Sequence, residues 1–342
     1  MTKKIYKWGI IGLGRIAHKF AQDLGQLPNA ELHAVASTDL ERSKQFSEQY
    51  QVPNYYGSYQ ELLSSGVDVV YLATPNHKHS EWAIICLQHK IAVLVEKPFA
   101  MNYPQAGFMQ KAAIANRTFL MEAMWTRFLP TTKQLLAVIE DGMIGSVITI
   151  KADFCAQMPF DPASRTYNLE MGGGSLLDIG IYPVYLSLLL LGMPVDVRVV
   201  ATKSKTKVDE SCFMILKYPG KQTAFLHSSF AHSSKVEAYI YGTMGTVHIR
   251  PRFHGLSSGF SVTNNQGETK DYPFTWDCLG YKYEASHVMD CLDRGLTESD
   301  LHPLETSMEL IRLLDAIRID GNIVYPEQDG VVSFENMEEG DE

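Results

Sequence analysis

The first part of the chain alternates short apolar segments with segments of helical periodicity, and this alternation restricts the fold more than any other feature. Five apolar segments occur at residues 6–14, 30–38, 67–75, 91–98 and 118–124, and four helical ones lie between them at 15–29, 39–50, 80–90 and 104–116. Strands that are apolar throughout are buried on both faces, and helices between them impose parallel pairing. We therefore predict an α/β domain over residues 1–122, built on a doubly wound parallel sheet.

The remainder of the chain, residues 123–342, has a different pattern. A helical segment is followed by segments that alternate apolar and polar residues or turn at glycine, at 146–154, 196–205, 211–219, 222–230 and 235–250, and a last helix is expected at 305–320. Such alternation is typical of antiparallel strands with one covered face. We predict a C-terminal α+β domain on a large, mostly antiparallel open sheet. Two domains also suit a chain of 342 residues.

Composition excludes several classes of partner. A formal net charge of −9 argues against binding to nucleic acid or to an anionic membrane. The 5 cysteines are scattered and form no close pair, which predicts free thiols in a reducing compartment and no metal site. The longest apolar run, residues 184–195, is too short to span a bilayer, and the N-terminus lacks the features of a signal peptide. We expect a cytoplasmic protein.

The segment "GLGRIA", residues 12–17, matches the glycine pattern of dinucleotide-binding loops. It follows the first predicted strand and opens the first helix, which is the context that this motif requires. Gly12 permits a tight turn, Gly14 lets a pyrophosphate approach the backbone, and Ala17 allows close packing of helix and strand. The N-terminal domain is therefore expected to be of the Rossmann type. Its loop contacts to the cofactor are expected from Gly12, Leu13, Gly14, Arg15 and Ile16.

The end of the second predicted strand bears on the choice between NADP and NAD. NAD-binding domains place an acidic residue there to bind the ribose hydroxyls. This chain has Ser37 and Thr38, with Arg42 one turn into the next helix. Hydroxyl groups and a guanidinium suit a 2′-phosphate, which favours NADP. The alternative is that Asp39 binds the ribose of NAD and Arg42 is a solvated helix charge.

Polar residues follow the third and fourth predicted strands. In doubly wound sheets ligands bind at the carboxyl ends of the strands. We therefore expect cofactor contacts from Thr74, Asn76, His79, Glu96 and Lys97. A metal site at the histidines of "NHKH" is disfavoured, since no acidic residue or cysteine nearby completes it.

The segment "GGGSLLDIGIYP", residues 172–183, places three glycines before a mostly apolar helix. Asp178 and Tyr182 are four residues apart, so they share one face of a helix. One interpretation is that Asp178 caps the helix and Tyr182 fills space in the core. The other is that both project into a site, behind a loop whose glycines press against cofactor or substrate.

Together, "GIIGLGRIA", "ATPNHKHSEWAIICLQHKIAVLVEKP" and "GGGSLLDIGIYP" resemble the Gfo/Idh/MocA oxidoreductase family. "MEAMWTRFLP" and "SRTYNLEMGGGSLLDIGIYP" resemble its dimeric dihydrodiol dehydrogenase and D-xylose dehydrogenase branch. Most members of the family have histidine at the position of Tyr182, whereas that branch has tyrosine. The resemblance implies hydride transfer between NAD(P) and a sugar, trans-diol or related carbonyl compound. It also implies a homodimer that pairs through the open sheets.

The resemblance further implies roles for individual residues. Tyr182 is the acid/base, Lys97 lies beside the nicotinamide and the substrate oxygen, and Lys97–Pro98 is a cis peptide bond. Asp178 would hold Lys97 or a substrate hydroxyl. A lysine cation near Tyr182 is expected to lower the pKa of the phenol.

Further contacts are expected close to the domain junction and in front of the glycines. Substrate contacts are assigned to Trp125, Arg127, Tyr167 and Trp276. Arg165 is assigned to the cofactor phosphate or the substrate, the alternative being a solvated arginine. A competing function is a non-catalytic dinucleotide-binding sensor or regulator on the same fold. Such a protein needs the phosphate loop, but it does not need Lys97, Asp178 and Tyr182 together.

Overall fold

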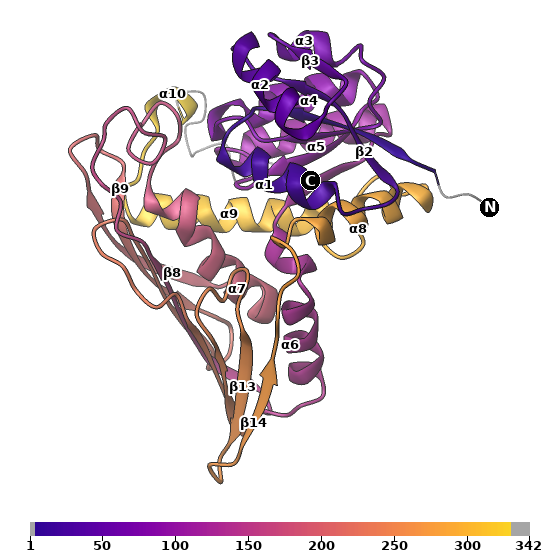
Figure 1. Ribbon diagram of the computed structural model, residues 1–342. Coiled ribbons are helices and arrows are strands. Elements are labelled where there is room, and N and C mark those ends of the chain that lie inside the picture. Colours follow the sequence, from indigo (N-terminus) through magenta and orange to yellow (C-terminus); the bar gives the residue numbers. More distant parts are fainter. Residues whose placement is uncertain (1–3, 330–342) are drawn as a thin grey trace.

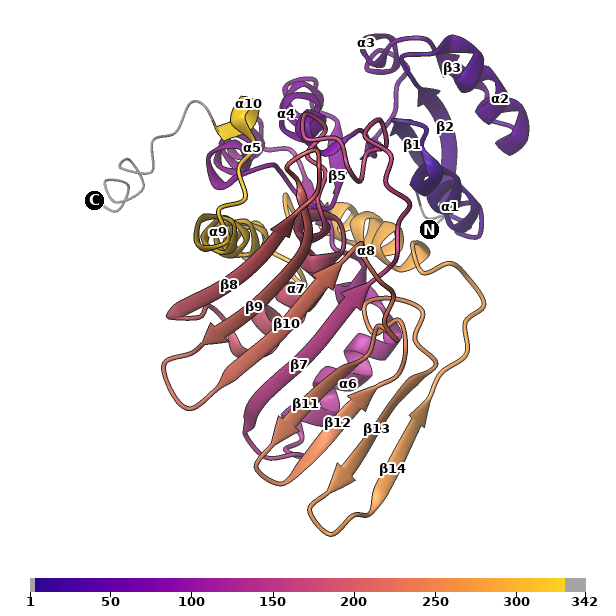
Figure 2. The same cartoon turned by 90° about the vertical axis from the view of Figure 1, so that its left-hand side faces the viewer.

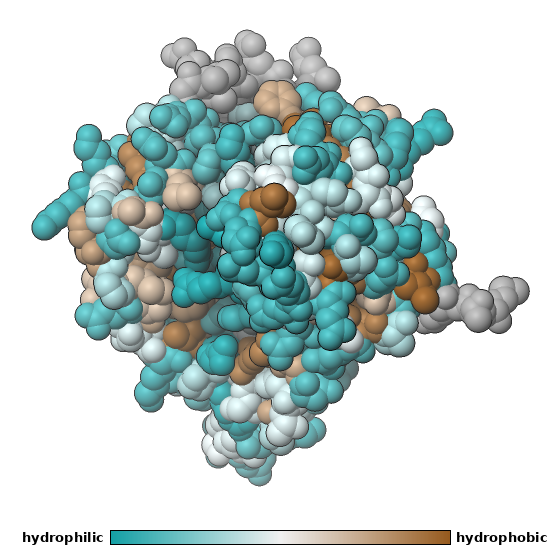
Figure 3. Space-filling view, turned by 45° about the horizontal axis from the view of Figure 1, so that its top comes forward, coloured by the Kyte–Doolittle hydropathy of each residue, from teal (hydrophilic) through white to brown (hydrophobic). Residues whose placement is uncertain are grey.

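The computed structural model describes residues 4–329, so the acidic residues that end the chain lie outside the described part. Two sheets organise the molecule, as Figure 1 shows: a parallel sheet with helices on both sides, and a larger sheet with helices on one side. No helix among residues 4–329 is long and apolar enough to cross a membrane. On the side seen in Figure 3, hydrophilic side chains predominate and apolar ones are scattered.

The N-terminal sheet has six parallel strands in the order β3-β2-β1-β4-β5-β6. Its elements are β1 (Tyr6–Ile11), α1 (Arg15–Leu24), β2 (Ala30–Ala36), α2 (Leu40–Tyr50), β3 (Asn54–Tyr56), α3 (Tyr59–Leu62), β4 (Val69–Leu72), the 3₁₀ turn η1 (Asn76–Lys78), α4 (His79–Gln88), β5 (Ala92–Glu96), α5 (Tyr103–Asn116) and β6 (Leu120–Ala123). Strands β4, β5 and β6 are buried throughout, as expected for a sheet that is covered on both faces. The predicted doubly wound fold is confirmed.

The C-terminal sheet has eight strands in the order β14-β13-β12-β11-β7-β10-β9-β8. The elements are η2 (Trp125–Phe128), α6 (Pro130–Glu140), β7 (Val147–Cys155), the π-helical turn η3 (Leu176–Gly180), α7 (Ile181–Leu191), β8 (Asp196–Lys203), β9 (Asp209–Lys217), β10 (Thr223–Ser229), β11 (Ala238–Gly242), β12 (Gly245–Ile249), β13 (Gly259–Asn264), β14 (Thr269–Pro273), α8 (Lys282–Asp293), α9 (Leu304–Asp320) and α10 (Pro326–Asp329). Strands β7 and β10 pair in parallel and every other pair is antiparallel, which confirms a mostly antiparallel sheet.

One face of this sheet is covered by α6, α7 and α9, whereas the other face has no helix over it within residues 4–329 (Figures 1 and 2). Large apolar side chains stand exposed on β8 to β11 of the open face: Val200, Phe213, Ile215, Phe225 and Tyr241. Cross-strand pairing places Phe213 beside Val200, and Phe225 beside Ile215. The exposed apolar residues of β8, β9 and β10 therefore form one patch.

Two buried acidic residues link the domains. Asp23, on α1, accepts hydrogen bonds from the backbone N–H groups of Leu279 (2.8 Å) and Tyr281 (2.7 Å). Asp315, on α9, accepts one from Tyr103 N–H (2.8 Å) and pairs with Arg318 at 3.0 Å. Both carboxylates satisfy groups that would otherwise be buried without partners, so they fix the domains to each other.

Some elements differ from the prediction. Strands β3, β13 and β14 and helices α3 and α8 were not predicted. The edge strand β14, with sequence TKDYP, is mostly exposed and lacks the apolar alternation that marks a half-buried strand. Helix α1 ends at Leu24 rather than near Pro28, since Gly25 follows it. Helix α5 begins at Tyr103, one residue before Pro104, and the Asn102 side chain accepts from Gln105 N–H (3.0 Å).

Candidate active site

The loop between β1 and α1 has the geometry of an anion-binding turn. Gly12 has a φ of +91°, and a Cβ there would lie 2.6 Å from the carbonyl oxygen of Ala73. Gly14 is the N-cap of α1, and a Cβ there would meet nothing within 4 Å. Among the described residues, no side chain caps the first turn of α1 and no acidic residue lies in it, so the N–H groups of Arg15 and Ile16 remain available to a pyrophosphate. The dinucleotide fits this loop.

At the end of β2, Asp39 acts as a helix cap. Its Oδ1 accepts from the N–H groups of Glu41 (3.0 Å) and Arg42 (3.2 Å). Ser37 is buried, and its hydroxyl accepts from Asp39 N–H (3.2 Å). Thr38 and Arg42 are exposed, and the Arg42 guanidinium lies 4.0 Å from the Asp39 carboxylate. The side chains of Thr38 and Arg42 thus reach solvent close to the end of β2.

The ends of β4 and β5 lie next to each other, as predicted. Thr74 is buried and its hydroxyl has no hydrogen-bond partner in the described structure. Asn76 donates to the carbonyl of Gly172 (3.1 Å), which joins this strand end to the glycine loop. Glu96 is buried and accepts a hydrogen bond from the Tyr71 hydroxyl; burial raises the pKa of its carboxyl.

The prediction that His79 contacts the cofactor does not fit the structure. His79 is 0% exposed, and its ring nitrogens lie 2.8 Å from Pro98 O and 3.0 Å from Thr74 O. It therefore ties the two strand ends together from inside the protein, which makes it a positioning residue.

A chain of charges connects three predicted site residues. The Lys97 ammonium donates to the backbone carbonyl of Asp178 (2.7 Å) and to its Oδ1 (3.2 Å). Arg165 binds both oxygens of the same carboxylate, at 3.0 and 3.2 Å. Burial alone would raise the pKa of Asp178, but Lys97 and Arg165 lower it to about 2. Asp178 is therefore ionised at neutral pH and does not act as a helix cap. The Lys97–Pro98 peptide bond is cis, as the resemblance implied.

Tyr182 lies against this group. The Lys97 Nζ atom is 5.2 Å from the centroid of its ring, and the residue is 9% exposed. His254 and Phe154 pack on the ring, with centroid distances of 4.7 and 5.9 Å. Trp125 stacks on Tyr281 at 4.8 Å. The site thus combines one phenol and one lysine cation with a wall of aromatic rings.

The expected lowering of the pKa of Tyr182 is wrong for this structure. Burial is the largest effect on the phenol and raises its pKa well above the ordinary value, and the Glu96 carboxylate acts in the same direction. The Lys97 ammonium faces the ring and is neutralised by Asp178, so it does not offset burial. Tyr182 is held as a neutral phenol, the form that donates a proton.

The three glycines contact protein rather than open space, contrary to the expectation that they press against a ligand. A Cβ at Gly172 would collide with Met101, one at Gly173 with the carbonyls of Thr166 and Asn168, and one at Gly174 with Asp209. Asp209 accepts hydrogen bonds from Ser175 Oγ (2.9 Å) and Leu176 N–H (2.6 Å). The loop is packed tightly at the start of the π-helical turn that carries Asp178. Such turns often mark functional sites.

Of the four predicted substrate residues, Trp125 lies among the rings around Tyr182, with its ring 6.1 Å from that of His254. Arg127 donates to Leu301 O (2.9 Å), and the Trp276 indole donates to Ser257 O (2.7 Å). Tyr167 is buried, with its ring 5.7 Å from that of Phe230.

Sequence reasoning missed His254 and Phe154 as neighbours of Tyr182. Phe154 lies near the end of β7 and His254 lies in the irregular segment after β12, so no periodic pattern could indicate that they converge. Burial lowers the pKa of His254 to about 3, so its ring is neutral.

Comparison with known proteins is consistent with this geometry. The model of the oxidoreductase family with an NAD-binding Rossmann fold matches residues 6–123, and that of the GFO/IDH/MocA C-terminal domain matches residues 132–248. The chain belongs to the Gfo/Idh/MocA oxidoreductase family. The predicted NAD(P)-dependent oxidoreductase is therefore confirmed at the level of the family.

Two relatives in this family carry the same name. The chain is 36% identical over 332 residues to the trans-1,2-dihydrobenzene-1,2-diol dehydrogenase of Xenopus laevis, covering 94% of this chain and 99% of the relative. It is 34% identical to the enzyme of that name from Homo sapiens over 340 residues, covering 94% and 98%.

Two solved structures are similar to this chain over more than nine-tenths of its length. A 3-ketoreductase from Actinomadura kijaniata, in complex with NADP and TDP-benzene, has a TM-score of 0.82 at 25% identity and covers 92% of this chain and 97% of its own. An aldose-aldose oxidoreductase from Caulobacter crescentus, complexed with glycerol, has a TM-score of 0.84 at 24% identity and covers 94% and 98%. The latter likeness shows the fold alone.

Proposed function

We propose that the protein is an NADP-dependent oxidoreductase that interconverts a CH–OH group and a carbonyl in a sugar or trans-diol. The observation that carries this proposal is the contact of Lys97 with both the Asp178 carboxylate and the ring of Tyr182. A regulator that only senses a dinucleotide would not need this group. The names of the relatives, a dihydrodiol dehydrogenase and a 3-ketoreductase, support the same class of reaction.

The bound nicotinamide would supply or accept the hydride. Tyr182 is the proton donor when the carbonyl is reduced and the acceptor when the alcohol is oxidised. Lys97 has three N–H donors, and two of them bind Asp178; within residues 4–329 the third has no acceptor, so it can bind the substrate oxygen. Arg165 and Asp178 position Lys97, and the aromatic wall limits the access of water to the phenol.

The preference for NADP rests on the end of β2. Asp39 is occupied as the cap of α2, while Thr38 and Arg42 are exposed beside it. A guanidinium and hydroxyl groups recognise a 2′-phosphate, whereas a ribose site of the NAD type needs a free carboxylate. The 3-ketoreductase of similar structure was solved with NADP.

The apolar patch on the open face of the large sheet supports a homodimer. Phe213, Ile215 and Phe225 are 49%, 47% and 47% exposed, which is unusual for adjacent large apolar side chains in a monomer. A second copy of the chain would offer the same patch, so a two-fold contact buries both.

The decisive experiment is turnover with a panel of pentoses, hexoses, trans-diols and dicarbonyls, with NADPH or NADP⁺ and with the NAD forms. The unmodified chain and Tyr182→Phe are compared. We expect the variant to bind the cofactor with unchanged fluorescence and to lose about 10²- to 10⁴-fold in turnover. Cofactor binding without turnover on every class of substrate would instead favour the sensor.

A further inference from the structure

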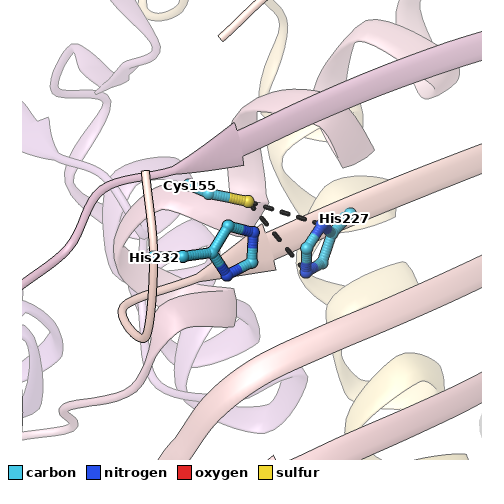
Figure 4. Close-up of side chains that lie close together, drawn as sticks. All are labelled: Cys155, His227 and His232. Atoms are coloured by element: carbon cyan, nitrogen blue, oxygen red, sulfur yellow. Dashed lines mark hydrogen bonds between the residues drawn. The ribbon is translucent and has the colours of Figure 1, made fainter. Parts of the chain in front are cut away.

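Cysteine and histidine side chains that are far apart in the sequence converge on the open face of the large sheet, at the far ends of β7 and β10. Figure 4 shows Cys155 at the end of β7, His227 on β10 and His232 just after β10 pointing toward one another. Their sulfur and nitrogen ligand atoms all lie within 4.8 Å of one another. This group lies outside the active site described above.

The spacing of Cys155 and His227 is close to that required by a tetrahedral zinc ion. Zinc lies about 2.3 Å from a cysteine sulfur and about 2.0–2.1 Å from a histidine nitrogen, so the two ligand atoms should be about 3.6 Å apart. In the structure the Cys155 Sγ and His227 Nδ1 atoms are 3.4 Å apart. The His227 ring presents both nitrogens to the sulfur, with Nε2 at 4.0 Å.

A second observation is a carboxylate beside His227. Asp153 lies opposite His227 in the parallel pairing of β7 and β10, two residues before Cys155 on the same face. Its Oδ2 is enclosed and has no hydrogen-bond partner in the described structure. A buried carboxylate oxygen without a partner is costly, and a divalent ion beside it would remove that cost.

The other candidate cluster that residues 4–329 contain has an aspartate in place of one histidine, and a cation already lies beside it. His287, Cys291 and Asp300 also converge, but Arg294 donates to Asp300 (2.7 Å) and to the Cys291 sulfur (3.5 Å). A guanidinium already supplies the positive charge there. Among the described residues, no lysine or arginine forms a salt bridge with Asp153.

We propose that Cys155, His227 and His232 form a zinc-binding site, with water in the fourth position and Asp153 beside it. The class of ion follows from the ligands, because one thiolate and two imidazoles suit Zn²⁺ rather than Mg²⁺ or Ca²⁺. The site joins the end of β7 to β10 and to the segment that follows β10. On the other face of β10, the Ser228 hydroxyl lies 3.0 Å from the hydroxyl of Ser175, at the start of the turn that carries Asp178. The ion would therefore stabilise the strand against which this turn packs.

The test uses the full chain, freed of metal by a chelator and then titrated with Co²⁺ as a spectroscopic probe. We expect one equivalent of Co²⁺ to produce a thiolate charge-transfer band and tetrahedral d–d bands, and Zn²⁺ to abolish both. Cys155→Ser should lose the charge-transfer band, and His232→Gln should bind Co²⁺ at least tenfold more weakly. The controls Cys278→Ser and His248→Gln, which change residues outside the cluster, should behave as the unmodified chain.

Cys155 is buried, so its replacement can disturb folding; His232 is exposed, and its variant keeps the proposal falsifiable. Zn²⁺ should raise the Tm of the unmodified chain and of the controls, but not that of His232→Gln. The absence of a charge-transfer band in the unmodified chain, or equal Co²⁺ affinity in His232→Gln, would overturn the proposal. Cys155 and His227 would then share an ordinary S–H···N hydrogen bond.

Discussion

Asp178 binds Lys97 twice, through its backbone carbonyl at 2.7 Å and through its side-chain carboxylate at 3.2 Å. The first contact depends on the backbone of the π-helical turn and the second on the side chain. Together they hold the Lys97 ammonium in place, and the carboxylate balances its charge. Arg165 holds the other side of the same carboxylate. The position of Lys97 relative to Tyr182 is thus set by Asp178 and Arg165, which lie more than 60 positions after Lys97 in the sequence.

Replacing Lys97 by methionine keeps the length of the side chain and removes its charge and its donors. We expect turnover to fall by about 10²- to 10³-fold, as for the loss of one donor to a developing oxyanion. Cofactor binding, followed by fluorescence, should change little. Lys111→Met, an exposed position on α5, is the control and should be fully active. Near-normal turnover of Lys97→Met would remove Lys97 from the mechanism.

The raised pKa of Tyr182 predicts a pH dependence with a definite sign. A phenol whose pKa lies above the ordinary value of about 10 stays protonated throughout the neutral and mildly alkaline range. Carbonyl reduction should therefore be independent of pH between about 7 and 9, and alcohol oxidation should rise with pH without a plateau below about 10. Single-turnover rates at saturating cofactor test this. A plateau in oxidation near neutral pH would show that the bound cofactor or substrate lowers the pKa of the phenol.

Arg42→Ala should weaken the binding of NADP and leave that of NAD unchanged. Hydrogen bonds to charged groups contribute about 1.5–3 kcal/mol, so Kd for NADPH should rise about 10- to 100-fold. Lys44→Ala, an exposed position on the same helix, is the control. Titration of both reduced cofactors by fluorescence gives the result, and an equal loss for NADH and NADPH would contradict recognition of the 2′-phosphate.

Gly174→Ala should destabilise the protein more than Gly66→Ala does. Both residues have positive φ, +120° and +80°, but a Cβ at Gly174 would collide with Asp209, whereas one at Gly66 would meet nothing within 4 Å. Strain at such φ values costs about 1–3 kcal/mol in each variant, and the collision adds to it only at Gly174. Urea unfolding measures the difference. Gly174→Ala should also lower turnover, because Asp209 orients the turn that carries Asp178; equal effects of both variants would show that the packing of the loop is unimportant.

Phe225→Asp should dissociate the proposed homodimer, because it places a charge within the apolar patch, beside Ile215. Phe108→Asp is the matched control, since Phe108 is also exposed (58%) but lies on α5. Sedimentation equilibrium of the three proteins gives their masses. A monomeric unmodified chain, or a dimer unaffected by Phe225→Asp, would rule out pairing through this face.

The parallel sheet, the phosphate loop and the residues at the strand ends were predictable from the sequence. Strands such as β4 and β5 are buried on both faces, so hydrophobic periodicity alone reveals them, and the loop at Gly12 needs local backbone geometry only. The resemblance left Lys97 or a substrate hydroxyl as the partner of Asp178, and the structure places Lys97 in contact with it.

Tertiary structure decided what depends on burial and on distant contacts. Whether Tyr182 is a neutral phenol follows from the rings of Phe154 and His254 and from the carboxylate of Glu96, which three separate segments bring together. One interpretation of the sequence made the glycine loop a ligand contact, but the loop packs on Met101 and Asp209. The sequence determines which side chains are available and the hydrophobic periodicity from which strands and helices are recognised. The free energy of ionising a buried group depends on everything packed around it, and only the folded chain assembles that environment.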